Sequence, residues 1–115
     1  MLPPSHRLNA TKEFQNVLKK GRRLFGQFVT VRYDFLAAPA KAKFGFIVST
    51  KISKLATRRN RIKRLLRENI RTDFLPRLVK PLKAVIIAKP EIVDKDFWQI
   101  KQDLEQLFSK THLIK

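Results

Sequence analysis

The chain of 115 residues contains no cysteine, which excludes disulfide bonds, thiolate zinc sites and a cysteine nucleophile. It also lacks a long apolar run: the longest, Ala84 to Ala88, is far shorter than the ~20 residues of a membrane helix. The first ten residues, MLPPSHRLNA, have no apolar core of the kind a signal peptide carries. These absences predict a soluble protein of a reducing cytoplasm.

Acidic residues are scarce as well. Nine Asp and Glu face 26 Lys and Arg, which gives a formal net charge of +17 and a sequence pI of about 11.1. Such a charge repels itself unless a polyanion neutralises it, so nucleic acid is the first partner class and an anionic membrane the competitor. Residues 1–90 hold 22 basic and 4 acidic residues, whereas residues 91–115 hold 4 and 5. One end of the chain therefore lies outside the basic surface.

The hydrophobic share of 43% and the length are sufficient for one folded domain spanning residues 1–115. Hydrophobic periodicity predicts the order α-β-β-α-β-α, an α/β (α+β) fold with helices packed on a single-layer sheet. The two early strands are expected to pair as a hairpin, and Asp94 or Asp96 to cap the last helix, whose aromatic residues, Trp98 included, are assigned to the core. The expected elements are helix 11–21, strands 28–36 and 44–50, helix 57–74, strand 83–89 and a helix after residue 96.

The predicted helix 57–74 opens with TRRNRIKRLLRE, which has six Arg or Lys in twelve residues. Basic residues recur every fourth position, so like charges stack on one face, and Asn60 and Arg64 lie beside them. The apolar residues occupy the opposite side, as in a helix that packs on a core. The stacked residues are Arg59, Lys63, Arg67 and Arg71, and the apolar ones are Ile62, Leu65, Leu66 and Ile70.

Three other interpretations compete with a polyanion-binding helix. A generic solvated face would mix both signs of charge to gain stabilising pairs. A membrane-surface helix would carry Trp or Phe opposite its charges, whereas this one carries Ile and Leu. A localisation-type basic run needs no amphipathic helix around it. The Arg-rich composition favours phosphate, because guanidinium groups bind phosphate oxygens bidentately.

No set of residues suggests a protein-based nuclease. The two histidines, His6 and His112, lie near opposite termini, and five of the nine acids fall in residues 91–105. Without a histidine cluster or a paired-carboxylate motif, we predict no catalytic residue in this chain. The sequence leaves open whether any side chain holds a metal ion.

The stretch KISKLATRRNRIKRLLRE, residues 51–68, resembles the signature of the bacterial ribonuclease P protein component. That family carries an Ala before an Arg-Asn-Arg core, followed by Lys-Arg and a later Arg. The matching residues are Ala56, Arg59, Asn60, Arg61, Lys63, Arg64 and Arg67. HRLNATKEFQNVLKKG, FGFIVSTK and AVIIAKP resemble flanking segments of the family, so the resemblance covers most of the chain.

The resemblance implies a protein subunit of a ribonucleoprotein endonuclease that removes the 5′ leader from precursor tRNA. The RNA subunit cleaves with Mg²⁺, and the protein positions the substrate and stabilises the RNA. The signature helix is implied to contact the catalytic RNA through Arg59, Asn60, Arg61, Lys63, Arg64 and Arg67, to which its helical register adds Arg71. The alternative is a structural, ribosomal-type RNA-binding protein, which the charge fits equally well.

The family also has a cleft between the first helix and the sheet, which holds the single-stranded leader by stacking and charge. The resemblance places Phe14, Leu18, Val31, Lys51 and Lys54 there. Leu18 and Val31 stand where the family often has aromatics, so Phe28 or Tyr33 are alternative stacking residues. Phe14 as a core residue, and Lys51 and Lys54 as solvent-facing lysines, are the competing interpretations.

The family fold is similar to a domain of a ribosomal small-subunit protein and contains a left-handed β-α-β crossover. Pattern reasoning alone favours the right-handed connection, which dominates in known sheets. For the hand of the crossover, our prediction follows the family.

Overall fold

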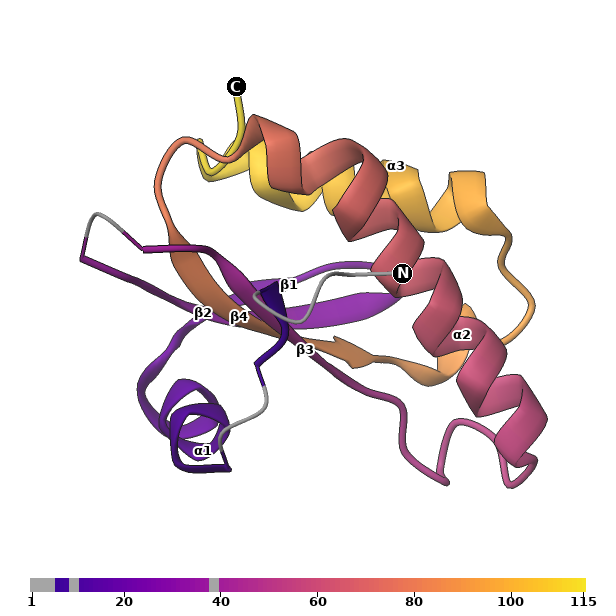
Figure 1. The fold of residues 1–115 in the computed structure, drawn as a ribbon. Coiled ribbons are helices and arrows are strands. Elements are labelled where there is room, and N and C mark those ends of the chain that lie inside the picture. The colour runs from indigo at the N-terminus through magenta and orange to yellow at the C-terminus, as the bar shows by residue number, and fades with distance from the viewer. Residues whose placement is uncertain (1–5, 9–10, 38–39) are drawn as a thin grey trace.

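The computed structural model describes residues 6–8, 11–37 and 40–115, which form a twisted sheet with helices on both faces (Figure 1). The strands are ordered β1-β2-β4-β3. In chain order the main elements are α1 (Thr11–Lys20), β1 (Arg22–Phe25), β2 (Val29–Phe35), β3 (Lys43–Ile47), α2 (Ala56–Asn69), β4 (Leu82–Ala88) and α3 (Phe97–Lys110). A π-helical turn (Ile70–Phe74) prolongs α2, and short 3-10 turns cover Leu75–Arg77 and Pro90–Ile92.

Strand β4 is central, as its unbroken apolar run predicted. It pairs antiparallel with β2 and parallel with β3, and Val85 and Ile86 are both fully buried although they point to opposite faces. The expected hairpin between residues 28–36 and 44–50 is wrong, because β4 lies between these two strands. An apolar strand from far along the chain buries more surface in the centre than a local hairpin would.

Strand β1 was missed by the sequence analysis. Its four residues, RRLF, are short and mostly exposed, so they show no clear alternation. Tertiary pairing creates the strand, since β1 runs antiparallel to β2 with Arg23 opposite Arg32 and Phe25 opposite Thr30. The real hairpin of this fold is therefore β1-β2.

The helices cover both faces of the sheet, rather than lying against one side. Helix α1 packs over a small apolar cluster of Leu8, Val17 and Val85. Helices α2 and α3 lie side by side on the opposite face, above the main core (Figure 1). The parallel pair β3 and β4 with α2 between them forms the expected β-α-β unit, and its left hand stays a prediction.

Of the two residues predicted as caps of the last helix, Asp94 and Asp96, the structure has Asp96. Asp96 is the N-cap and accepts a hydrogen bond from the Gln99 backbone N–H at 2.9 Å, while the Gln99 side chain accepts one from the Asp96 N–H at 3.0 Å. The assignment of Trp98 to the core is wrong, since its side chain is 64% exposed. Trp98 falls on the outer face of α3, and Ile100 and Leu104 face inward.

Across the parts of the chain that the structure describes, no helix combines the length and the apolar character needed to cross a membrane. In the same parts, no three His, Cys, Asp or Glu side chains lie close enough together to hold a metal ion.

His112 closes helix α3 in the left-handed region, with φ of 60°. The Leu113 N–H donates to the Phe108 carbonyl at 2.9 Å and the His112 N–H to the Ser109 carbonyl at 3.1 Å, as in a Schellman motif. The left-handed conformation costs a non-glycine residue about 1–2 kcal/mol. Glycine avoids this cost, but about half of the gain is lost because glycine has more conformational freedom in the unfolded chain. We expect His112→Gly to stabilise the fold by about 0.5–1 kcal/mol in urea unfolding. His112→Ala is the control, and equal stabilisation by both variants would contradict this explanation.

Candidate nucleic-acid interface

The basic residues of α2 form its outer and flanking surface. Ile62, Leu66, Asn69 and Ile70 are buried on the inner side of the helix, against α3 and the sheet. The predicted contact residues are all exposed or half-buried, so the division into an apolar and a basic side is confirmed. Asn60, Arg61, Arg64 and Arg71 are exposed, whereas Arg59, Lys63 and Arg67 are half-buried.

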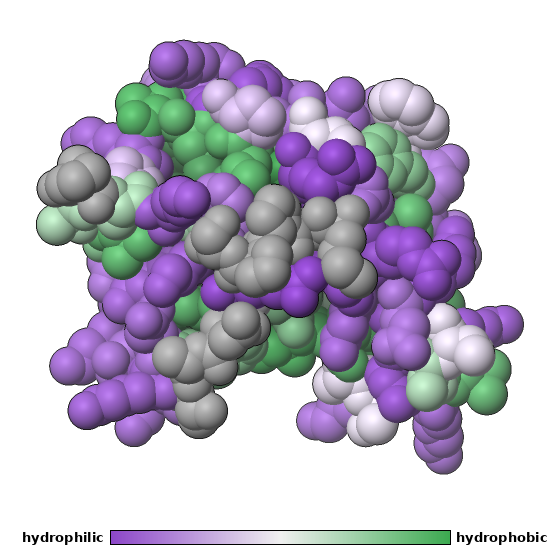
Figure 2. Space-filling model, viewed as in Figure 1, coloured by the Kyte–Doolittle hydropathy of each residue, from purple (hydrophilic) through white to green (hydrophobic). Residues whose placement is uncertain are grey.

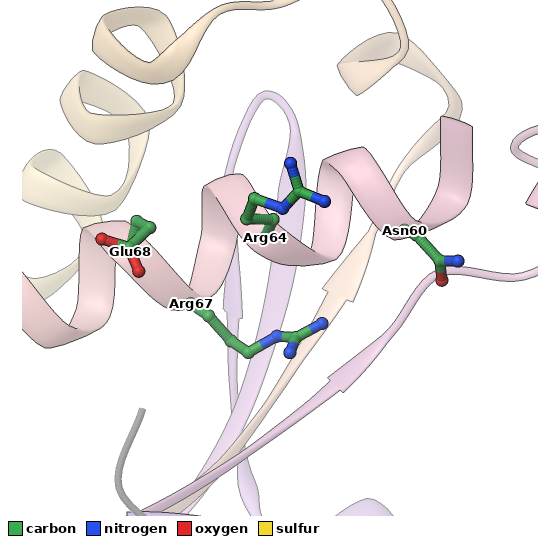
Figure 3. A pocket seen from close by; sticks show the side chains of 4 residues that line it. All are labelled: Asn60, Arg64, Arg67 and Glu68. Atoms are coloured by element: carbon green, nitrogen blue, oxygen red, sulfur yellow. The ribbon is translucent and has the colours of Figure 1, made fainter. Parts of the chain in front are cut away.

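The first hollow of this surface lies on the outer side of α2 and measures about 400 Å³. Its lining is Asn60, Arg64, Arg67 and Glu68 (Figure 3). The guanidinium groups of Arg64 and Arg67 extend toward the Asn60 end of the helix, and the Glu68 carboxylate points the other way (Figure 3). This arrangement presents two forked donors and an amide to the same volume, which suits phosphate and sugar oxygens.

Glu68, the single acid among residues 57–68, forms an ion pair with Arg71. Glu68 accepts a hydrogen bond from Arg71 at 2.7 Å, and the Arg71 hydrogen bond lowers the pKa of the Glu68 carboxyl below its usual value. Arg71 is thus the predicted contact residue whose charge is locally balanced. Arg59 donates to the Ser53 carbonyl at 2.8 Å and so fastens the segment before α2. Within the described residues, neither Arg64 nor Arg67 has an acidic partner.

A second hollow, of about 230 Å³, lies between α2, the start of the chain and β3. Lys63 and Arg67 line it from α2, Phe14 from α1 and Gly45 from β3; its remaining lining residues are Arg7, Leu8, Phe44 and Phe46. Arg67 therefore borders both hollows. The two hollows therefore adjoin along one flank of α2.

Gly45 makes room for the ring of Phe14. A Cβ at Gly45 would lie 2.5 Å from the Cε2 atom of Phe14, which is closer than real contacts allow. The ring consequently rests on the strand backbone, half-buried, and packs with Leu18 against the cluster under α1. Phe14 is thus part of a small core and of the hollow at once, which reconciles the two interpretations of this residue.

Two other residues predicted for the cleft lie on the opposite face of the sheet. Val31 is fully buried in the main core, so its prediction as a cleft residue is wrong. Phe28 is half-buried against the same core, with the Lys95 ammonium 5.4 Å from its ring centre. The alternative stacking residue Tyr33 is also in that core and only 5% exposed. A slip of one residue along a strand moves a side chain to the other face.

The residues that do face α1 beyond Phe14 and Leu18 were missed. Phe25, Thr30, Ile87 and Ile47 are successive neighbours across all four strands, and Ile47 and Ile87 pack against the cluster under α1. All are partly exposed, Phe25 at 71%. Figure 2 shows the molecule hollowed at its lower edge, between α1 and the segment that leads into α2. The strict alternation of β2 contained this signal, because it places Thr30 opposite to the buried Val29 and Val31.

Further basic residues border the same region. Lys51 and Lys54 are exposed in the connection between β3 and α2, so the solvent-facing interpretation and a contact to an RNA strand both stay open for them. Arg58 is exposed in the first turn of α2 and was not among the predicted contacts. The double Arg at 58–59 was the available signal.

Two acids, Asp73 in the turn after α2 and Glu105 on α3, are paired within the protein. Arg77 bonds Glu105 at 2.8 Å and Asp73 at 3.2 Å, and the Arg77 hydrogen bond lowers the pKa of the Glu105 carboxyl. Lys101 also approaches Asp73, at 3.9 Å. Because these two acids pair with Arg77 and Lys101, neither of them neutralises Arg64 or Arg67 of α2.

Comparisons with known proteins find similar chains over nearly the whole length. The family model of ribonuclease P matches residues 2–112. The ribonuclease P protein component of Microcystis aeruginosa is 34% identical over 116 residues, which cover 98% of this chain and 96% of the relative. That of Bacillus velezensis is 36% identical over 111 residues, covering 96% and 92%.

Solved structures are similar over nearly the whole chain. The RNase P protein of Thermotoga maritima has a TM-score of 0.78 at 26% identity and covers 90% of this chain and 96% of that one. The RNase P protein of Staphylococcus aureus, at 24% identity, has a TM-score of 0.83 and covers 96% and 98%. The likeness to the latter concerns the fold alone.

Proposed function

Because the chain belongs to the bacterial ribonuclease P protein family, we propose that it binds the catalytic RNA through α2 and the single-stranded leader of precursor tRNA beside α1. Proteins of this family are subunits of ribonuclease P, the ribonucleoprotein endonuclease that processes the 5′ end of tRNA, and this chain is such a subunit. Family membership decides against the ribosomal-type alternative.

The observation that carries the catalytic-RNA contact is the outer face of α2. Asn60, Arg64 and Arg67 share one hollow, and within the described part of the chain no acid neutralises the two guanidinium groups. Each Arg or Lys that neutralises a phosphate releases a condensed counterion, so binding is expected to weaken steeply with salt. The contact set we propose is Arg59, Asn60, Arg61, Lys63, Arg64 and Arg67, with Arg58 added from the structure and Arg71 as a weaker member.

The leader contact is proposed on the α1 face of the sheet. Phe14 offers a partly exposed ring at one end of this face and Phe25 at the other, with Thr30, Ile87 and Ile47 in between. Stacking on aromatic rings tolerates any base, which suits leaders of varied sequence. Lys63 and Arg67 reach the Phe14 end of this face from α2, so the leader and the catalytic RNA would meet along that flank.

Catalysis is assigned to the RNA subunit with Mg²⁺, in the cytoplasm. The role that we propose for this chain is to bind and position the two RNAs. Its own contribution is electrostatic: a protein of charge +17 reduces the repulsion between two RNA molecules that must approach each other.

Reconstitution tests the proposal directly. Adding the protein to ribonuclease P RNA at low Mg²⁺ should raise the rate of precursor tRNA cleavage, because protein cations replace part of the screening that Mg²⁺ provides. An unchanged rate in the presence of a folded, RNA-bound protein would overturn the proposed role.

Removing the Phe14 ring should affect leader recognition selectively. We expect Phe14→Ala to weaken holoenzyme binding to leader-bearing precursor by roughly 5- to 50-fold, as for the loss of one stacked base, and binding to mature tRNA far less. Gly45→Ala places a methyl group where the Phe14 ring packs and should show the same selectivity. Affinities for both RNAs, measured by equilibrium gel shift, check this. An equal loss for precursor and mature tRNA would show that the ring only supports the core.

A further inference from the structure

A third cationic and aromatic surface lies at the end of the sheet remote from the leader-binding face. Phe35, the last residue of β2, is 37% exposed. The Arg22 guanidinium carbon lies 5.4 Å and the Lys80 ammonium 5.6 Å from the centre of its ring. We call Arg22, Phe35 and Lys80 the Phe35 platform. Neither α2 nor α1 contributes to it.

The position of the platform separates it from both surfaces already described. Phe35 lies on the same face of β2 as Val29, Val31 and Tyr33, because residues two apart in a strand share a face. It therefore points to the side of the sheet opposite α1. It is five residues from Thr30 along the strand, or about 17 Å. Its ring is held edge-on against the buried ring of Tyr33, with centroids 5.7 Å apart, which fixes its orientation.

Two hollows flank the platform and share Val79 and Lys80. One, of about 100 Å³, has Phe35 in its wall, and the other, of about 290 Å³, has Lys41. None of their lining residues is acidic. The neighbouring Asp34 points to the other face of the sheet and accepts a hydrogen bond from the Phe35 N–H. Within the described chain, no carboxylate forms an ion pair with the Arg22 guanidinium or the Lys80 ammonium, and both charged groups lie against the Phe35 ring.

We propose that the Phe35 platform binds one unpaired nucleotide of RNA, with its base on the Phe35 ring and its phosphate between Arg22, Lys80 and Lys41. An exposed cation–π contact is weaker than the stacking of a base on an aromatic ring. A base can therefore displace a cation from the ring, and the displaced cation gains a phosphate partner. The proposal relies on the chain working with RNA and adds a contact that the leader-binding face and α2 do not provide.

Trp98 provides a matched comparison within the same molecule. It is more exposed than Phe35, at 64%, and the Lys101 ammonium lies 5.2 Å from its ring centre. Its hollow contains Glu105, Gln102 and Gln106, and Lys101 also approaches Asp73. Trp98, like Phe35, therefore has a cation over its ring. The surroundings of Trp98, however, include acids and lack the excess of positive charge found around Phe35.

Photo-crosslinking of the full chain tests the proposal. An oligouridine of about 12 nucleotides, carrying iodouridine, spans the size of a typical single-strand site and reacts with stacked aromatic rings. We expect cross-links to Phe35 and none to Trp98. The double variant Arg22→Gln with Lys80→Gln keeps the ring and should lower the Phe35 cross-link about 10-fold or more, since two charge-assisted contacts are lost. Cross-links to Phe14 or Phe25 in the same digest report the leader-binding face separately.

Three results would overturn the proposal. Cross-links confined to α1, Phe25 or α2 would leave the platform without a nucleotide. Equal labelling of Phe35 and Trp98 would mean that exposure alone determines the reaction. Competition by oligoglutamate as effective as by unlabelled oligouridine would identify a general acidic-peptide site. Because the unsubstituted chain supplies the first two readouts, neither depends on the folding of a variant.

Discussion

Replacing Arg67 by alanine is expected to lower the affinity of the protein for ribonuclease P RNA by roughly 10- to 100-fold, the value of one lost charge-assisted phosphate contact. Arg67 is the residue that borders both hollows beside α2. The slope of log affinity against log salt should flatten by about one phosphate. Filter binding across a series of salt concentrations measures both quantities.

Arg64→Ala should flatten the slope equally, but it borders only the outer hollow and should leave leader selectivity unchanged. Lys110→Ala removes the same charge from an exposed site at the end of α3 and serves as the control for net charge. If Lys110→Ala weakened binding as much as Arg67→Ala, the total charge of the chain, and not the surface of α2, would account for affinity.

Of the substitutions that we propose, removal of the Asp103 carboxylate is expected to lower the free energy of unfolding the most. Asp103 is 5% exposed and accepts hydrogen bonds from the backbone N–H groups of Gln27 and Phe28, both at 2.8 Å. It thereby ties the β1-β2 turn to α3. Asp103→Ala loses two charge-assisted bonds and leaves two N–H groups unpaired, so we expect a loss of about 2–4 kcal/mol. The melting temperature should fall by roughly 10–25 °C for a domain of this size.

Two variants distinguish this bridge from a general effect of charge. Asp103→Asn keeps the volume and one good acceptor, and should cost about half as much. Asp94→Ala removes an 80% exposed carboxylate near Lys95 and should change stability by less than about 0.5 kcal/mol. A melting temperature of Asp103→Ala within about 2 °C of the unsubstituted protein, well below the expected shift, would show that the turn does not depend on this bridge.

The anchored turn connects stability to the proposed function. A Cβ at Gly26 would lie 2.7 Å from one carboxylate oxygen of Asp103, so glycine lets the turn approach the buried acid. The turn joins β1 to β2 and so places Phe25 opposite Thr30 on the α1 face of the sheet, where we propose that the leader binds. Loss of Asp103 is consequently expected to loosen the Phe25 end of that face before the Phe14 end.

The sequence by itself determined the features that depend on local pattern. The stripe of α2, the doubly apolar strand β4, the helix with Phe14 and a cap at Asp94 or Asp96 follow from spacing along the chain, and the structure selects Asp96 as the cap. The basic set on α2 was predictable for the same reason, since a 3.6-residue period places every residue of one helix relative to the others. Charge alone indicated a polyanion as the partner, and the family was suggested by the resemblance of residues 51–68 to its signature.

Only the tertiary structure decided the features that depend on distant pairing. Strand β4 enters between β2 and β3, which removes the expected hairpin and makes β1 a strand. Register then assigns Thr30, and not Val31, to the face of α1. Arg67 borders both hollows because α2 passes beside Phe14 and Gly45, which are residues of other elements. Burial of apolar surface selects these contacts from the whole chain at once, and no local pattern contains that choice.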